Sequence, residues 1–456
     1  MFQRFFDEGL AQASFLVGSD RSRETVVIDP RRDVSIYLDA ARQQGATIVA
    51  AIETHVHADF VSGARELAQA GVRVITGPDS HVGFKHHEVR DGETLALGDV
   101  TLSFLHSPGH TLEHICVQAE APGEPVRLFT GDLLFVGGVG RPDLAGESLT
   151  RRLAGDLFDS LQRVMRGDDR TEIHPGHGAG SLCGAGIGKE PSSTIARERR
   201  QNAMLQHSDR RAFVEAVLAD IPPTPPYFPR MKRVNANGPA LLADTWFARG
   251  LPSIQPSAAA ALAADGAMII DLRQADAFSA AHPYGALSIG FGAKVGYWAG
   301  WIVPADVPLL LMADDPSQAR EAALQLLRVG LDRVEGSIAG GMTAWQSAGL
   351  PTATLEQISA AELREAIMRG EPMQIVDVRT PDEWASGHAP GALNIPVGDI
   401  PARAATLRRD VGIVTMCEGG YRSMIAASLL EREGITHLAN LAGGMAAYKA
   451  TGEFTT

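Results

Sequence analysis

Histidine and aspartate side chains follow four short apolar segments in the first half of the chain. The first group lies in Thr54-His55-Val56-His57-Ala58-Asp59, and His110, Asp132 and His177 follow on later loops. Imidazole nitrogens and carboxylate oxygens are the ligands that divalent transition metals take in proteins. A single His-x-His occurs in many surface turns, but four such loops in succession are typical of a metal site. We therefore expect these residues to gather around a divalent cation.

The segments that position these residues have the pattern of an α/β fold. The runs 48–52, 100–104 and 127–130 are short and apolar, as buried strands are. The spacing of apolar residues between them predicts helices at 34–44 and 60–71. Each candidate ligand would then lie on a loop at the carboxyl end of a strand.

The composition narrows the class of protein. With 456 residues the chain is expected to hold about two to four domains. A net charge of −13 gives no electrostatic reason to expect nucleic acid or an anionic membrane as a partner. No apolar run approaches the roughly 20 residues that span a bilayer, and the N-terminus lacks the form of a secretory signal, so we expect a cytoplasmic protein. The three cysteines, Cys116, Cys183 and Cys417, are too few and too widely spaced for a disulfide framework.

The second half of the chain repeats itself with a period of about 105 residues. Three motifs recur at a nearly constant offset: 269–273 at 375–379, 282–289 at 388–395, and 339–345 at 442–448. This period suits a small domain, and each copy alternates strands and helices as an α/β unit with a parallel sheet does. Upstream, the segment 221–229 holds five prolines and is expected to be extended throughout. The expected domains are 1–245, 246–352 and 353–456.

Cys417 opens a short glycine-containing loop in the second copy. The loop follows the strand expected at 413–416 and leads into a helix. Backbone N–H groups of the loop, the positive end of the helix and Arg422 would converge on the sulfur, which lowers a thiol pKa and makes the sulfur a nucleophile. We therefore expect Cys417 and Arg422 to be catalytic. The residues expected to bind the substrate there are Gly419, Gly420 and Ser423.

The metal-ligand pattern resembles the metallo-β-lactamase superfamily over about residues 10–210, which implies an αββα sandwich. The two-zinc hydrolases of that superfamily carry a histidine directly after the aspartate of the first motif, where this chain has Phe60. A phenyl ring has no donor atom to coordinate a metal ion, so the pattern favours one metal in place of two. Its ligands would be His55, His110 and Asp132, the set of two histidines and one carboxylate that suits Fe(II). The resemblance makes three further residues either alternative ligands or hydrogen-bond partners that orient the ligands: His57, Asp59 and His177.

Within the superfamily, the chain resembles the persulfide dioxygenases. Four of its motifs occur in the order of that family, at 54–63, 107–111, 131–144 and 175–178. The resemblance implies one ferrous ion per chain and a low-molecular-weight persulfide, such as glutathione persulfide, as the substrate that O₂ oxidises to sulfite.

Two further residues of this half have two interpretations each. Arg141 would lie near the mouth of the site and hold a substrate carboxylate, or else pair with Asp143 inside a turn. Cys183, six residues after His177, could relay sulfur or serve as a small apolar filler. Cys116 is expected in the core.

The Cys417 loop, with segments 377–379 and 387–396, resembles the rhodanese sulfurtransferases over about residues 355–454. Related phosphatases place five residues between cysteine and arginine, whereas this chain places four, which is the sulfur-sized loop. In the first copy Ala313 replaces the cysteine and Pro316 removes an N–H donor, so that copy cannot perform thiolate chemistry. It is expected to be an inactive rhodanese-like domain that serves packing or docking.

The expected protein is a metallo-β-lactamase-like sandwich followed by two rhodanese-like α/β domains with parallel sheets. This order resembles the persulfide dioxygenase-sulfurtransferase fusions of sulfide detoxification. The iron domain would form sulfite, and a Cys417 persulfide would link sulfite and thiosulfate in either direction. Two alternatives stay open: a zinc-dependent thioester hydrolase of the glyoxalase II type fused to a sulfurtransferase, and a non-catalytic persulfide carrier or sensor. The expected partners are small molecules, and the sequence leaves the oligomeric state open, a homo-oligomer included.

Overall fold

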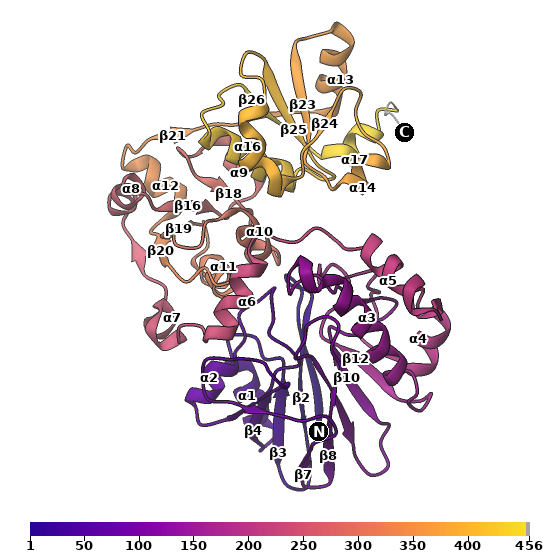
Figure 1. The fold of residues 1–456 in the computed structure, drawn as a ribbon. Coiled ribbons are helices and arrows are strands. Elements are labelled where there is room, and N and C mark those ends of the chain that lie inside the picture. The colour runs from indigo at the N-terminus through magenta and orange to yellow at the C-terminus, as the bar shows by residue number, and fades with distance from the viewer. Residues whose placement is uncertain (453–456) are drawn as a thin grey trace. The chain divides into compact units, whose positions relative to one another are not determined.

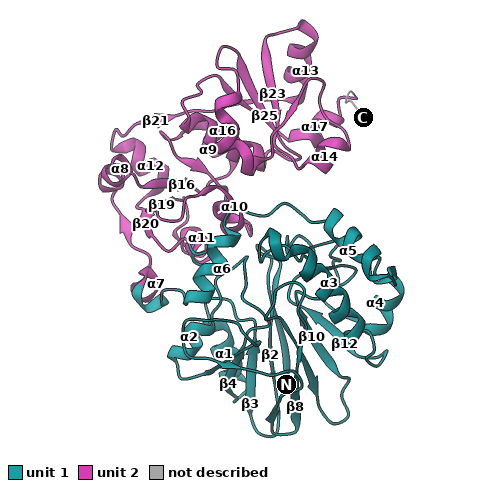
Figure 2. Cartoon of the chain, viewed as in Figure 1, with its two compact units in different colours: residues 1–244, 327–330 teal, residues 245–326, 331–456 magenta. Residues whose placement is uncertain are grey.

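The structure, a computed structural model, describes residues 1–452 and divides into two compact units (Figures 1 and 2). The first unit comprises residues 1–244 together with 327–330, and the second comprises residues 245–326 and 331–452. Within residues 1–452, no helix combines the length and the apolar character needed to cross a bilayer.

Two six-stranded sheets form the centre of the first unit. One has the order β1-β2-β3-β4-β5-β6 and the other β14-β12-β10-β9-β8-β7. The strands of the first sheet are β1 (Phe2–Asp7), β2 (Gln12–Gly18), β3 (Glu24–Ile28), β4 (Thr47–Ile52), β5 (Arg73–Thr76) and β6 (His87–Glu88). Those of the second are β7 (Thr94–Leu97), β8 (Val100–His106), β9 (Ile115–Glu120), β10 (Arg127–Gly131), β12 (Glu172–Pro175) and β14 (Ser193–Thr194). A small third sheet pairs β11 (Val139–Gly140) with β13 (Gly184–Ala185).

Helices cover the outer faces of both sheets (Figure 1). Tyr37 of α1 and Leu67 of α2 pack on the first sheet, and Leu157 of α3 packs with Phe213 of α5 on the second. Phe129 belongs to a separate apolar cluster between the sheets. The helices are α1 (Ser35–Gln43), α2 (Ala64–Gln69), α3 (Glu147–Val164), α4 (Ile195–Gln201), α5 (Arg210–Ala219) and α6 (Phe228–Asn237). Because each sheet is covered on both faces, its central strands are apolar throughout, and the αββα sandwich expected from the sequence is confirmed.

The second unit contains two five-stranded parallel sheets built on the same plan. Their orders are β15-β20-β19-β16-β18 and β22-β26-β25-β23-β24, so each strand of one has a counterpart in the other. The first sheet comprises β15 (Ser253–Ile254), β20 (Val334–Ile338), β19 (Leu309–Met312), β16 (Met268–Asp271) and β18 (Leu287–Ser288). The second comprises β22 (Glu356–Ile358), β26 (Leu438–Leu441), β25 (Gly412–Met416), β23 (Met373–Asp377) and β24 (Leu393–Asn394). The shared strand order confirms two parallel-sheet α/β domains.

Helices flank both sheets of the second unit. In the first copy these are α8 (Pro256–Ala264), α9 (Ala275–Ala280), α10 (Val295–Ile302), α11 (Pro316–Arg328) and α12 (Gly341–Ser347). In the second copy they are α13 (Ala360–Arg369), α14 (Pro381–Ala385), α15 (Ile400–Arg403), α16 (Tyr421–Arg432) and α17 (Gly444–Lys449).

The starts of two helices differ from what the sequence predicts. The segment 221–229 is not extended throughout, because α6 begins at Phe228 and Pro229 lies in its first turn. A proline is tolerated there, since its missing N–H would have no partner within the helix. The helix expected at 60–71 begins only at Ala64, because the preceding residues form a loop that is hydrogen-bonded to other segments.

Candidate functional site

The direction of three strands brings the candidate ligands of the second sheet to one edge. β8 and β10 are each antiparallel to β9 and therefore run in the same direction, and β12 is parallel to β10. His110, Asp132 and His177 lie on the loops that follow these three strands, and His55 follows β4 of the other sheet. All four side chains are buried.

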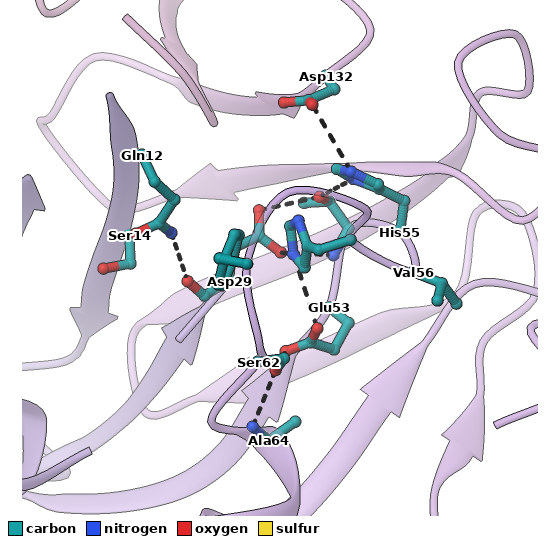
Figure 3. A network of polar contacts seen from close by, with 12 residues as sticks. Gln12, Ser14, Asp29, Glu53, His55, Val56, Ser62, Ala64 and Asp132 are labelled. Carbon is teal, nitrogen blue, oxygen red and sulfur yellow. Dashed lines mark hydrogen bonds and ion pairs between the residues drawn. The ribbon is translucent and has the colours of Figure 1, made fainter. Parts of the chain in front are cut away.

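Three candidate ligand atoms converge at this edge. They are the Nε2 atoms of His55 and His110 and the Oδ2 atom of Asp132. Asp132 Oδ2 lies 3.7 Å from His55 Nε2 and 3.5 Å from His110 Nε2, and the first of these contacts is drawn in Figure 3. The three ligand atoms all lie within 4.8 Å of one another. His55 Nε2 and Asp132 Oδ2 are buried and have no hydrogen-bond partner among residues 1–452. Buried polar atoms without a partner are costly, so their convergence needs an explanation such as a bound cation.

Hydrogen bonds to the other ring nitrogens fix which nitrogen of each histidine is free. Thr54 Oγ1 donates to Asp29 Oδ2 at 2.9 Å, so toward His55 it accepts, and the Nδ1–H of His55 donates to it at 2.9 Å. The Nδ1–H of His110 donates to the Arg141 carbonyl at 2.8 Å. Both neutral rings therefore present an unprotonated Nε2 toward Asp132, as metal-binding histidines do.

The charges of the group also suit a cation. Burial lowers the pKa of His55 well below its ordinary value and lowers that of His110, although Asp132 opposes the shift in both. Burial alone would raise the pKa of Asp132, but the charge and the hydrogen bond of the protonated His177 hold it well below its usual range. Two neutral imidazoles and one carboxylate are a donor set that a divalent transition metal accepts. The residues present therefore fit a single metal ion.

His57 is engaged elsewhere. Its Nε2 lies 3.1 Å from Asp29 Oδ1 and 3.6 Å from Glu53 Oε2. Burial would lower its pKa, but Asp29 and Glu53 raise it to about 9. The ring of Phe60, fully buried, lies 4.4 Å from that of His57. The structure thus does not gather His57 with the three ligand atoms.

The two ring nitrogens of His177 are hydrogen-bonded to two different carboxylates. Its Nδ1 lies 2.7 Å from Asp132 Oδ1 and its Nε2 lies 2.8 Å from Asp59 Oδ2. Burial would lower its pKa, but these carboxylates raise it well above the ordinary value, so the ring donates from both nitrogens. Gly176 permits this approach, because a Cβ there would lie 2.9 Å from Asp132 Oδ1. His177 and Asp59 therefore orient Asp132 by hydrogen bonds.

In the second unit, Cys417 lies at the end of β25 with two donors on its sulfur. The Gly420 N–H donates to Cys417 Sγ at 3.1 Å and the Ser423 hydroxyl at 3.4 Å. Gly420 has φ +97°, a left-handed conformation that glycine adopts without strain. Gly419 is exposed, and a Cβ at this position would meet no other side chain or backbone atom within 4 Å. Cys417 itself is buried.

Arg422 contacts a carboxylate that the sequence patterns did not single out. Its two terminal nitrogens contact Glu383 of α14 at 2.6 and 2.7 Å. Burial would lower the pKa of Arg422, but Glu383 and then Cys417 raise it. Arg422 therefore lies near the Cys417 sulfur and forms an ion pair with Glu383.

The first copy retains the scaffold of this loop without its nucleophile. Arg273 binds Asp271 and the Ala281 carbonyl, and Arg379 binds Asp377 and the Gly387 carbonyl in the same way. At the position that corresponds to Cys417, however, β19 is followed by Ala313. The first copy therefore keeps the fold and lacks the thiol.

Both halves of the chain are similar to known protein families. The sequence pattern of the Metallo-beta-lactamase superfamily matches residues 7–177, and that of the Rhodanese-like domain matches residues 255–348 and 359–451. A hydroxyacylglutathione hydrolase from Xanthomonas euvesicatoria pv. vesicatoria is 31% identical over 205 residues, which are 44% of this chain and 75% of that protein. The chain belongs to the metallo-beta-lactamase superfamily. Its superfamily domain is followed by two rhodanese-like domains.

Two solved structures are similar to this superfamily member. The metallo-beta-lactamase from Staphylococcus aureus subsp. aureus COL is 30% identical with a TM-score of 0.65, over 74% of this chain and 98% of that one. The ETHE1 protein from Myxococcus xanthus is 27% identical with a TM-score of 0.44, over 52% of this chain and 96% of that one.

The metallo-beta-lactamase domain contains a buried histidine that sequence reasoning missed. His114 Nε2 accepts from the Asp132 N–H at 3.1 Å, and its Nδ1–H donates to Ser107 Oγ at 2.9 Å. Burial lowers the pKa of His114 to about 3, so the ring stays neutral and can accept. It lies in a strand-like stretch, and only its closeness to the metal loop at His110 could have singled it out.

The expected role of Arg141 as a substrate anchor needs correction. Its side chain is only 1% exposed and binds Asp143 through two contacts of 2.7 Å. Its remaining N–H groups face the carbonyls of Leu182 and Pro223 and the Thr224 hydroxyl. A guanidinium has five N–H donors, and with all of them engaged in the fold none is left for a substrate. The Arg-Asp pair is the interpretation that this placement supports.

Cys183 lies at the metal site, but as a buried thiol. Its sulfur, His177 and Asp59 offer ligand atoms within 4.8 Å of one another. Burial, Asp59 and Asp132 raise the pKa of the Cys183 thiol well above its ordinary value, which disfavours a nucleophilic relay. Cys116 is fully buried in β9, as expected of a core residue.

Proposed function

We propose that this protein is an iron-dependent persulfide dioxygenase coupled to a sulfurtransferase. The observation that carries the proposal is the group of His55, His110 and Asp132, with two free imidazole nitrogens and one free carboxylate oxygen. Two neighbours would be needed to complete a second metal site. His177 directs both of its ring nitrogens at carboxylates, and His57 directs its Nε2 at Asp29. This arrangement supports one metal ion per chain.

Two histidines and one carboxylate are the donor set of non-haem Fe(II) oxygenases. Ferrous iron bound there would supply open coordination positions for sulfur and O₂. The protein contributes orientation: Thr54 and the Arg141 carbonyl fix the two imidazoles, and His177 fixes the carboxylate. Burial of the group limits access of bulk water.

The proposed substrate is a low-molecular-weight persulfide such as glutathione persulfide. Its S–S bond breaks, the sulfane sulfur gives four electrons to O₂, and water completes the balance. One persulfide, one O₂ and one water thereby yield one thiol, one sulfite and two protons.

The second reaction of the proposal takes place at Cys417. The Cys417 thiolate attacks the outer sulfur of a second low-molecular-weight persulfide, and the thiol leaves with the proton. The resulting Cys417 persulfide transfers that sulfur to sulfite, which gives thiosulfate and returns the Cys417 thiolate. The Gly420 N–H and the Ser423 hydroxyl are placed to stabilise that thiolate, and Arg422 to attract the sulfite anion. The transfer is reversible, so the same loop can draw sulfur from thiosulfate.

A thioester hydrolase is the second candidate, because the curated relative that is 31% identical is named a hydroxyacylglutathione hydrolase. That activity would use a metal-activated water in place of O₂. The two candidates predict different metals and different substrates.

Reconstitution of the metal-free protein separates them. Samples loaded with Fe(II) or with Zn(II) are assayed for O₂ uptake with glutathione persulfide and for hydrolysis of S-lactoylglutathione. The proposal predicts O₂ uptake in the iron sample alone. Thioester hydrolysis by the zinc sample, without O₂ uptake by the iron sample, would replace it with the hydrolase.

A further inference from the structure

Asn235 of α6 is hydrogen-bonded to the loop that carries His57 and Asp59. Its side-chain amide donates to the His57 carbonyl at 2.8 Å and to the Phe60 carbonyl at 2.7 Å. Its oxygen accepts from the Ser62 N–H at 2.9 Å. Asn235 follows His57 by 178 residues and lies outside the region 7–177 that matches the superfamily.

The chemistry of the amide explains why this position needs asparagine. An amide has two N–H donors and a carbonyl acceptor, and here the amide meets two backbone carbonyls and one backbone N–H. A carboxylate of the same shape could accept from Ser62 but would repel both carbonyls. Asn235 is 6% exposed, so lost bonds would be replaced poorly by water.

The helix that carries Asn235 is itself fixed to the first unit. Met231 is fully buried, the Gly83 N–H donates to the Ala236 carbonyl at 2.6 Å, and Arg65 donates to the Gly238 carbonyl at 2.9 Å. The amide is therefore held by a rigid support and can impose a position on the loop.

The two bonded carbonyls bracket Ala58 and Asp59. Asp59 contacts His177 at 2.8 Å, and His177 contacts Asp132 at 2.7 Å. We infer that Asn235 is a positioning residue of the metal centre, which holds Asp59 and, through His177, sets the orientation of the Asp132 carboxylate. This inference rests on the metal site of the proposed function, but not on iron as the metal or on the reaction.

Cobalt(II) binding tests the inference without reference to activity. The variant Asn235→Asp is titrated with Co(II) while the visible absorption of the metal is recorded. We expect metal binding to weaken by about ten- to hundred-fold, as for other groups that orient metal ligands, and the Co(II) spectrum to change. The matched control is Asn237→Asp, the same substitution at an exposed side chain of the same helix, which should leave affinity and spectrum as in the wild type.

The variant Asn235→Ala removes the same three hydrogen bonds without adding a charge. It should shift affinity and spectrum in the same direction, and it decides the question if Asn235→Asp does not fold. Wild-type affinity and spectrum in a folded Asn235 variant would overturn the inference. A wild-type protein that binds no Co(II) would instead contradict the metal site on which the proposed function rests.

Discussion

Glu383 binds Arg422 through both terminal nitrogens, with Oε2–Nη1 and Oε1–Nη2 distances of 2.6 and 2.7 Å. Glu383 also accepts from the Thr380 N–H at 2.9 Å, so its own position is fixed by the first turn of α14. A forked carboxylate pair of this kind fixes the plane of a guanidinium as well as its charge. Arg422 is thereby held beside Cys417 before any substrate arrives.

Replacing Glu383 should impair sulfur transfer without removing the nucleophile. In Glu383→Gln the side chain loses its negative charge, so Arg422 is held less firmly beside Cys417. The kcat/KM for sulfur transfer from thiosulfate to cyanide should therefore fall roughly tenfold, mainly because KM rises. The control Glu365→Gln, which breaks an exposed pair with Arg369 in the same domain, should change nothing measurable. Wild-type KM in Glu383→Gln would show that the pair does not position Arg422.

The same pair should give the second unit a pH-dependent stability. Arg422 lowers the pKa of Glu383 to about 2, whereas a carboxyl in the unfolded chain titrates near about 4.3. A depressed pKa stabilises the fold above the unfolded value and loses that contribution as pH falls toward the folded value. The Tm of the wild type should therefore exceed that of Glu383→Gln by a constant margin above about pH 5 and by a shrinking margin between about pH 4.5 and 2. A margin that widens in acid would contradict the assignment.

Removal of the Cys417 thiol should separate the two reactions. Cys417→Ser should abolish thiosulfate-to-cyanide transfer, because a hydroxyl cannot carry sulfane sulfur. O₂ uptake with glutathione persulfide should stay at the wild-type rate, while the products shift from thiosulfate toward sulfite. The measurement is ion chromatography of the products, and an unchanged product ratio would mean that the two sites are not coupled.

The ligand assignment predicts that substitutions of the two histidines of the first motif have different effects on the amount of bound metal. His55→Ala should reduce bound metal from about one per chain to near zero, because it removes one of three ligands. His57→Gln should retain about one metal, since His57 Nε2 is directed at Asp29 in the structure. Elemental analysis of both variants decides the point, and a similar loss of metal in each would make His57 a ligand.

Local patterns in the sequence were sufficient for the fold and for much of the candidate site. Alternating strands and helices predicted an α/β class, and the resemblance to the metallo-β-lactamase superfamily implied the sandwich. The duplicated motifs predicted two α/β units with parallel sheets, and the structure adds that both sheets share one strand order. The residues that the sequence did not single out contact the candidate sites from distant positions in the chain. Asn235 reaches the loop of His57 from a helix beyond the proline-rich segment, and Glu383 meets Arg422 from another helix.

Arg141 shows a different limit of sequence reasoning. Its partners include Leu182 and Thr224, which are distant in the sequence and carry no motif. Whether an arginine is free to bind a substrate depends on how many of its five donors the fold already uses, and only the folded chain determines that number.

O₂ uptake by the anaerobically purified, iron-loaded protein tests the central claim most directly. With glutathione persulfide as substrate, an oxygen electrode combined with sulfite and thiosulfate analysis should record one O₂ consumed for each oxidised sulfur atom. The His110→Ala variant should consume none, because it lacks a ligand. Full iron loading of the wild type without O₂ uptake would contradict a persulfide dioxygenase.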